Sequence, residues 1–203
     1  MIKAVIFDVG GVLVRTMNRN GRNRLEARLG LDPGESEQIF FNSEMGTKAQ
    51  TGHITSAEHL QWLQSHLNLS DSELDDFQRD FWDGDRLDTE LVDFIRQLQQ
   101  HYQTAIISNA QDNLLHFVTD LYPMADAFGL IVGSAYEKVM KPAPAIYEQT
   151  LARLGREAHE AVFIDDFAHN IAGAKAVGMH GIHFQPEIDL PQELAKLGVQ
   201  LSS

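Results

Sequence analysis

The sequence AVIFDVGGVL, at positions 4–13, is the stretch from which the fold can be worked out. A short apolar run without helical spacing, closed by two glycines, predicts a buried strand of a parallel sheet. Asp8 follows this run directly, and in open parallel sheets ligands bind in the crevice outside the carboxyl ends of the strands. Gly10 and Gly11 allow the backbone to turn sharply and to approach a ligand. Taken alone, the stretch predicts a strand whose Asp8 either carries chemistry or initiates a turn.

The composition limits the classes of protein to which the chain can belong. Its 203 residues, 43% of them hydrophobic, suffice for one core with a small appended domain. Because there is no cysteine, disulfides and thiolate sites are excluded, and a metal would need oxygen or histidine ligands. The formal net charge of −13 opposes binding to nucleic acid or to an anionic membrane. No apolar run approaches the roughly 18 residues of a membrane span, and the first strand starts too early for a signal peptide, so we expect a cytoplasmic protein.

Two kinds of periodicity divide the chain. Between positions 16 and 86 apolar residues recur at helical spacing, with helix-capping signals at 55–58 and 70–73, which predicts a small helical bundle without strands. From position 88 onward, strand-like and helical stretches alternate as they do in βα units. The predicted strands lie at 104–107, 130–132, 161–164 and 181–184, and the predicted helices at about 88–100, 112–121, 145–154, 170–177 and 191–197. The layout is a parallel α/β sheet whose first strand is separated from the others by a helical insertion.

Polar side chains stand at the ends of these elements. They are Asp8, Ser108 with Asn109, Lys141, and Asp165 with Asp166. A carboxylate such as Asp8 can attack phosphorus and form an aspartyl-phosphate, and Asp8 with Asp166 would supply the oxygen ligands that Mg²⁺ takes. Lys141 adds a point charge on the transferring group, and the Ser108 hydroxyl can donate to a phosphate oxygen. Together these residue types indicate phosphoryl transfer.

Each of these positions also has a purely structural explanation. Asp165 and Asp166 could cap the helix that follows them. Ser108 and Asn109 could form a turn, and Lys141 could be a solvated lysine of a loop. Their joint occurrence, each after a strand-like run, favours the functional explanation.

With these residues in place, the chain resembles the haloacid dehalogenase-like (HAD) hydrolase superfamily. The resemblance rests on the order Phe7-Asp8-Val9-Gly10-Gly11, Ile107-Ser108-Asn109, Lys141-Pro142 and Phe163-Ile164-Asp165-Asp166 with Asn170. It covers essentially the whole chain, which looks most like the bacterial α-D-glucose-1-phosphate phosphatases and the phosphatase domain of soluble epoxide hydrolase. The implied architecture is a Rossmann-like parallel sheet core, formed by residues 1–15 and 87–203, with an inserted helical cap domain at residues 16–86.

The resemblance also implies a role for each polar residue. Asp8 would be the nucleophile, with Lys141 beside it, and the phosphate would lie among Ser108, Asn109 and Lys141. The ligands of Mg²⁺ would be Asp8, the carbonyl of Gly10 and Asp166, with Asp165 in close support. The expected substrate is a small phosphorylated metabolite, with a sugar phosphate favoured, and the expected assembly is a monomer or a weak homodimer.

One position departs from the pattern of this family's phosphatases. They usually carry a second Asp two residues after the nucleophile, as general acid and base, and Gly10 stands there in this chain. Such a group typically contributes about 10²–10⁴-fold, so its loss favours leaving groups that need little protonation, such as an anomeric oxygen. The glucose-1-phosphate group also has Gly at this position. His53 and His59 would replace the missing acid if they faced the site, but we expect both to be surface histidines.

Two alternatives to the phosphatase remain open. A carboxylate nucleophile on the same scaffold can displace halide, as in a 2-haloacid dehalogenase, although paired Asp165 and Asp166 suit a metal that such an enzyme does not need. The second alternative is a weakly active HAD-like binding or regulatory protein. It is suggested by Gly10, which stands in place of the usual acid and base.

Overall fold

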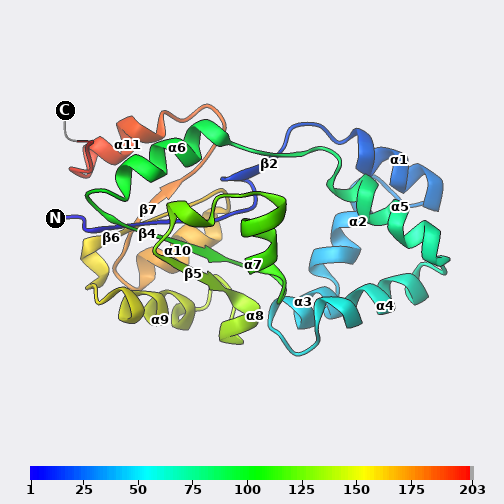
Figure 1. Cartoon of the computed structure of the whole chain (residues 1–203). Coiled ribbons are helices and arrows are strands. Elements are labelled where there is room, and N and C mark those ends of the chain that lie inside the picture. Colours follow the sequence, from blue (N-terminus) through cyan, green and yellow to red (C-terminus); the bar gives the residue numbers. More distant parts are fainter. Residues whose placement is uncertain (202–203) are drawn as a thin grey trace.

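The computed structural model describes residues 1–201, and its centre is a five-stranded sheet in the order β5-β4-β1-β6-β7 (Figure 1). Every pairing in this sheet is parallel. The strands are β1 (Ala4–Phe7), β4 (Gln103–Ser108), β5 (Leu130–Gly133), β6 (Ala161–Asp165) and β7 (His180–His183). The predicted parallel α/β fold is confirmed, and the first strand of the chain lies at the middle of the sheet.

Helices cover both faces of the sheet, which is why the central strand β1 is apolar throughout. Side chains alternate along β1, so that Val5 and Phe7 enter one hydrophobic cluster while Ala4 and Ile6 enter the other. The covering helices are α6 (Thr89–Leu98) and α11 (Leu190–Lys196) on the first face, and α9 (Pro144–Leu154) and α10 (Ala168–Ala176) on the second. Figure 1 shows α6 and α11 above the sheet and α9 below it.

Short elements complete the sheet layer. The helix predicted over 112–121 is divided into α7 (Leu114–His116) and a π-helical turn (Phe117–Leu121). Helix α8 (Ser134–Glu137) follows β5, and single 3₁₀ turns lie at Ala125–Ala127 and Ala158–Glu160. The four other helices predicted after position 88 lie within two residues of their expected ends. Throughout residues 1–201, no helix combines the length and the apolar character needed to cross a bilayer.

The insertion after the first strand has a hydrophobic cluster of its own. Its helices are α1 (Asn20–Leu29), α2 (Glu35–Glu37), α3 (Glu44–Gln50), α4 (Ser56–His66) and α5 (Asp71–Trp82), with a π-helical turn at Gln38–Asn42. The buried members of the cluster are Leu25, Phe40, Leu63, Leu69, Phe77 and Phe81. Thr55 and Ser70 form the capping boxes that start α4 and α5. These helices lie to one side of the sheet (Figure 1), which supports the predicted cap, although its exact boundaries stay a prediction.

The expectation that residues 16–86 contain no strand was wrong. Strands β2 (Val14–Thr16) and β3 (Asp85–Leu87) form an antiparallel pair where the chain leaves the sheet layer and returns to it. Each strand has only three residues, and its partner lies about seventy positions away in the sequence. Neither strand therefore has the local alternation by which a strand can be predicted from sequence.

Candidate active site

Asp8 lies at the carboxyl end of the central strand, directly after β1. Its backbone N–H extends the ladder by donating to the carbonyl of Ile164 at 2.9 Å. The side chain is only 9% exposed. Its Oδ1 accepts a hydrogen bond from the N–H of Val9 at 2.7 Å and lies 2.8 Å from Nζ of Lys141. Phe7 pairs with Ile164 in the parallel register of β1 and β6. The residues that follow them, Asp8 and Asp165, therefore lie side by side.

The turn after Asp8 brings the backbone against Asp166. Gly11 has a φ of 75°, and a Cβ there would lie 2.1 Å from Oδ2 of Asp166, so only glycine fits. Gly10 differs, because its φ lies outside the left-handed region and an added Cβ would meet no atom of the described chain within 4 Å. The turn thus requires Gly11, whereas Gly10 leaves space for a side chain.

Three carboxylates meet at this edge of the sheet. Oxygen atoms of Asp8, Asp165 and Asp166 all lie within 4.8 Å of one another. The donors to the fully buried Asp165 are Lys141 Nζ at 2.6 Å, the N–H of Phe167 at 2.7 Å and Asn170 Nδ2 at 3.1 Å from each oxygen. Asp166 differs, since its buried Oδ1 has no hydrogen-bond partner among residues 1–201. The protein therefore satisfies Asp165 and leaves an oxygen of Asp166 for a ligand.

The electrostatics of these carboxylates fit a divalent cation. Burial raises the pKa of Asp8 to about 7, opposed by the charge of Lys141 and reinforced by that of Asp165. Burial, and then the charge of Asp165, raise the pKa of Asp166 to about 6. One ammonium thus faces three carboxylates, and a dication among them would favour their ionised forms. Carboxylate oxygens are ligands that Mg²⁺ prefers, so the cluster and the unpaired oxygen of Asp166 fit a magnesium site.

Lys141 is the cation of the site and is held from both sides. Its side chain is 1% exposed, and Nζ lies between Asp8 and Asp165 and 5.3 Å from the ring centroid of Phe163. Asn109 fixes its backbone, because Asn109 Oδ1 accepts from the N–H of Lys141 at 2.8 Å and Nδ2 donates to its carbonyl at 3.1 Å. The side chain of Asn109 therefore orients Lys141, and its direct contact with a phosphate stays a prediction.

Most of the residues singled out in the sequence come together here. The structure gathers Asp8, Lys141, Asp165 and Asp166, while Ser108 ends the neighbouring strand β4 and is 6% exposed. Two contributors had no assigned role, namely Phe163 beneath the ammonium and Asn170 on Asp165. Asn170 had a signal, because on the helix after β6 it lies within reach of the carboxylate that ends the strand. Phe163 had none, since an aromatic residue in a buried strand is usually there for packing.

The two candidate histidines of the insertion have different surroundings. His53 is exposed, and its Nδ1 lies 2.8 Å from Oγ1 of Thr51. His59 was expected at the surface, and that expectation was wrong, because its side chain is fully buried and Nδ1 lies 2.9 Å from Nε2 of Gln111. The physical reason is helical spacing, which puts His59 on the same face of α4 as Leu63, four residues later.

With this geometry in view, comparison with known proteins identifies the class. The chain belongs to the haloacid dehalogenase-like hydrolase family, whose model matches residues 2–178. It is similar to the sesquiterpene phosphatase astK of Aspergillus oryzae, with 30% identity over 196 residues that cover 96% of both chains. It is also similar to the D-ribitol-5-phosphate phosphatase of Bacteroides thetaiotaomicron, with 26% identity over 206 residues that cover 96% of this chain and 97% of that one. The protein is thus a phosphatase-like hydrolase of the HAD family.

Solved structures share the fold at lower identity. A HAD family enzyme from Bacteroides thetaiotaomicron, in complex with magnesium and inorganic phosphate, has a TM-score of 0.78 at 22% identity, covering 95% of this chain and 99% of that one. The L-2-haloacid dehalogenase of Xanthobacter autotrophicus, with chloropropionic acid covalently bound, has a TM-score of 0.67 at 19% identity, covering 100% of this chain and 85% of that one. Because both chemistries occur on this fold, the reaction has to be argued from the site.

Proposed function

We propose that the protein is a Mg²⁺-dependent phosphatase that hydrolyses a small phosphorylated metabolite through an aspartyl-phosphate on Asp8. The observation that carries this proposal is the placement of Asp8 and Asp166. Asp8 lies 2.8 Å from a buried ammonium, and Asp166 presents a buried oxygen without a partner in the described chain. A nucleophile, a cation and a free ligand oxygen at one strand edge are the parts that phosphoryl transfer requires.

In the first step, a carboxylate oxygen of Asp8 attacks the phosphorus atom. The new bond joins that oxygen to phosphorus, and the bond from phosphorus to the leaving oxygen breaks, with its electron pair going to the leaving oxygen. Lys141 holds Asp8 in place and offers positive charge to the transferring group. Ser108 donates its hydroxyl to a phosphate oxygen. Asp8, Asp166 and the carbonyl of Gly10 would hold Mg²⁺, which would supply positive charge near the phosphoryl group.

In the second step, water attacks the same phosphorus atom and loses a proton to solvent. The bond from phosphorus to the Asp8 oxygen breaks, and its electron pair returns to that oxygen, which releases inorganic phosphate and restores the Asp8 carboxylate. Since Gly10 offers no side chain, the leaving oxygen takes its proton from solvent rather than from an aspartic acid. We infer that good substrates have leaving groups of low basicity, such as aryl, acyl or anomeric oxygens.

The substrate, the location and the assembly belong to the same proposal. The resemblance to glucose-1-phosphate phosphatases supports a sugar phosphate, whereas the names of the relatives include both a sesquiterpene and a ribitol phosphate phosphatase. The net charge of −13 supports a small-molecule substrate over nucleic acid. We further propose a cytoplasmic monomer or weak homodimer.

Dehalogenation is the second candidate, because a structural neighbour is a dehalogenase. A screen of phosphorylated metabolites with the purified protein, with and without EDTA, separates the two reactions. We expect release of phosphate that EDTA abolishes, and no release of chloride from 2-chloropropionate. Chloride release that persists in EDTA, without phosphate release from any ester, would overturn the phosphatase proposal.

A further inference from the structure

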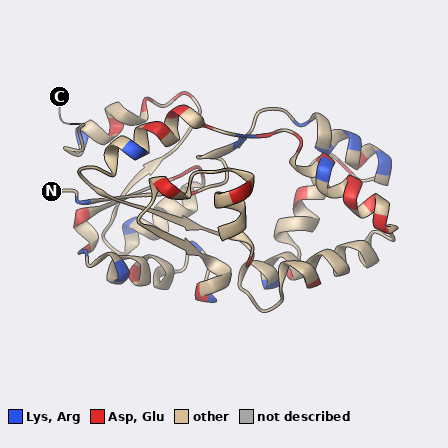
Figure 2. Cartoon of the chain, in the orientation of Figure 1, with Lys and Arg blue, Asp and Glu red and all other residues tan. Residues whose placement is uncertain are grey.

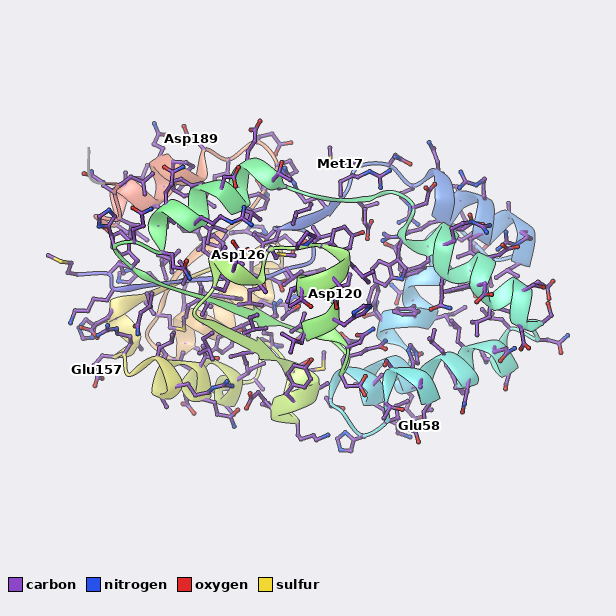
Figure 3. The ribbon with its side chains drawn as sticks, viewed as in Figure 1. Met17, Glu58, Asp120, Asp126, Glu157 and Asp189 are labelled. Atoms are coloured by element: carbon purple, nitrogen blue, oxygen red, sulfur yellow. The ribbon has the colours of Figure 1, made fainter. Side chains whose placement is uncertain are left out.

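One set of hydrogen bonds between the insertion and the sheet layer involves residues 110–112, the segment that directly follows Ser108 and Asn109, and Lys138 makes a separate one with the carbonyl of Gly52. In this set, the N–H of Ser56 donates to Oδ1 of Asp112 at 3.0 Å, and Nδ1 of His59 lies 2.9 Å from Nε2 of Gln111. Ser134 links the two parts indirectly, because its hydroxyl donates to the carbonyl of Gln50 at 2.5 Å and accepts from the N–H of Ala110 at 3.0 Å. In Figure 3, Asp120 marks the continuation of this segment between the sheet and the insertion, and Glu58 marks α4. Helix α4 therefore touches the loop that carries two residues of the proposed phosphate site.

The His59–Gln111 contact is buried, as is the bond between Ser134 and Gln50, and it is the one that joins two side chains. His59 is fully buried and Gln111 is 9% exposed. The amide nitrogen of Gln111 can only donate, so Nδ1 of His59 accepts this hydrogen bond. Burial lowers the pKa of His59, which favours the form of the imidazole that can accept. The ring is held in place by Phe40 and Trp62, whose ring centroids lie 5.0 and 5.7 Å away. His59 is thus a fixed acceptor that presents one atom of the insertion to the loop.

The loop transmits this contact to the site over very few bonds. Gln111 lies two residues after Asn109, whose side chain binds both the N–H and the carbonyl of Lys141. Between them, the N–H of Ala110 is bound by the hydroxyl of Ser134. A shift of Gln111 would therefore move Asn109 and, with it, the ammonium that lies 2.8 Å from Asp8.

We propose that His59 is a positioning residue: by accepting a hydrogen bond from Gln111, it couples the docking of the insertion to the binding of phosphate at Ser108 and Lys141. This inference rests on the proposed phosphatase function. It differs from a packing role, in which His59 would fill the core of the insertion and matter only for stability. It also differs from an acid role, because His59 acts here through Gln111 and touches no reacting atom.

The test is the affinity of the full-length protein, saturated with Mg²⁺, for inorganic phosphate, measured by isothermal titration calorimetry. We expect His59→Ala and Gln111→Leu each to weaken the Kd for phosphate by about tenfold, within the usual range of coupling between sites. The double variant should bind about as weakly as either single one, because both remove the same contact. His59→Asn should restore affinity, since its amide oxygen can take the place of Nδ1. His66→Ala is the matched control, because His66 stacks on Trp62 of the same helix at 4.7 Å and its side chain makes no hydrogen bond to the loop within residues 1–201.

The outcomes separate this inference from the function on which it rests. If the parent protein binds phosphate and His59→Ala binds it equally well, with only the melting temperature lowered, the coupling is refuted and the phosphatase proposal stands. If the parent protein with Mg²⁺ binds no phosphate, the phosphatase proposal fails and takes the inference with it. If His59→Ala fails to fold, the phosphate affinity of Gln111→Leu tests the coupling instead. This variant removes the same hydrogen bond from the sheet layer and leaves the core of the insertion unchanged.

Discussion

Buried charges occur in both parts of this protein, but only one set of them is balanced. In the insertion, the buried guanidinium of Arg22 donates from Nη2 to both oxygens of Asp85 at 3.1 Å, from Nη1 to Glu37 at 2.6 Å and from Nε to the carbonyl of Phe81 at 2.9 Å. At the end of β1, Lys141 faces three carboxylates, and Asp166 keeps a buried oxygen without a partner in residues 1–201. The first set holds the fold together, whereas the second is incomplete without a ligand.

The surface of the insertion follows the balanced pattern. Arg24 lies 2.9 Å from Asp83, and Arg28 lies 2.8 Å from Asp80, so that α1 is joined to the end of α5. Figure 2 shows the basic residues of α1 beside the acidic residues of α5. Because Oε2 of Glu26 in the insertion is also buried without a partner in residues 1–201, an unpaired oxygen alone does not mark a functional site. The end of β1 is distinguished by three carboxylates that gather around one ammonium.

The largest expected effect comes from removing the charge of Asp8. We expect Asp8→Asn to lower the rate of phosphate release by about 10⁴-fold or more, because the nucleophile is lost. Its stability without metal should stay the same or rise at pH 8, since the variant removes a buried charge whose pKa is raised to about 7. Single-turnover kinetics and thermal melting measure the two effects. Full activity in purified Asp8→Asn would refute the assignment of the nucleophile.

The matching change in the balanced set should act on stability instead. Asp85→Asn leaves the buried Arg22 with less countercharge, so we expect the free energy of unfolding to fall by about 3 kcal/mol while the chemical step is preserved. Urea unfolding, together with kcat for the folded fraction, checks this expectation. A variant of normal stability but without activity would mean that Asp85 belongs to the catalytic machinery.

A smaller effect is expected from adding a side chain at the open glycine. Because Gly10 has an ordinary φ and free space for a Cβ, Gly10→Asp should fold and supply the missing acid. The parent protein should prefer aryl over primary-alkyl phosphates by about 10²-fold or more, and the variant should narrow that margin. The measurement is kcat/KM over a graded series of phosphate esters. Equal rates across the series in the parent protein would show that another group supplies the proton or that another step limits the rate.

The smallest effect is a dependence of metal stabilisation on pH. The pKa values of Asp8 and Asp166 are raised in the folded state, to about 7 and about 6, so protonation of these groups favours folding. The stabilisation that this protonation provides is complete below the pKa of the unfolded chain, about 4. It is lost as the pH rises through the pKa values of the folded state. Mg²⁺ favours the ionised forms, so EDTA should lower the Tm by a few degrees at pH 8 and by less at pH 5.5. Asp166→Asn should reduce this difference, and an equal effect of EDTA at both pH values would argue against metal binding by these carboxylates.

Local sequence patterns were enough to predict most of the fold and to name most of the candidate residues. The strand after position 4 is buried on both faces and is therefore apolar throughout, and the capping boxes at Thr55 and Ser70 depend on residues three positions apart. The candidates Asp8 and Asp166 could be named because each follows a strand-like run, whereas helix α8 lies between β5 and Lys141. In a parallel sheet all such runs end at one edge, so their order along the chain is enough to bring them together.

Tertiary structure decided the features that depend on contacts between distant parts of the chain. The pairing of β2 with β3, the burial of His59 against Gln111 and the use of Asn109 to hold Lys141 all join segments separated by 32 to 73 positions. The two glycines were alike in sequence, yet only Gly11 is forced by its φ and by Asp166, a residue 155 positions later. The sequence by itself thus determined the sheet, the helices and the chemical types of the site, because these depend on periodicity and on residue identity. Which polar atoms are satisfied and which remain free for a ligand was decided only by the fold, since a hydrogen bond depends on distance and direction in space, which periodicity does not specify.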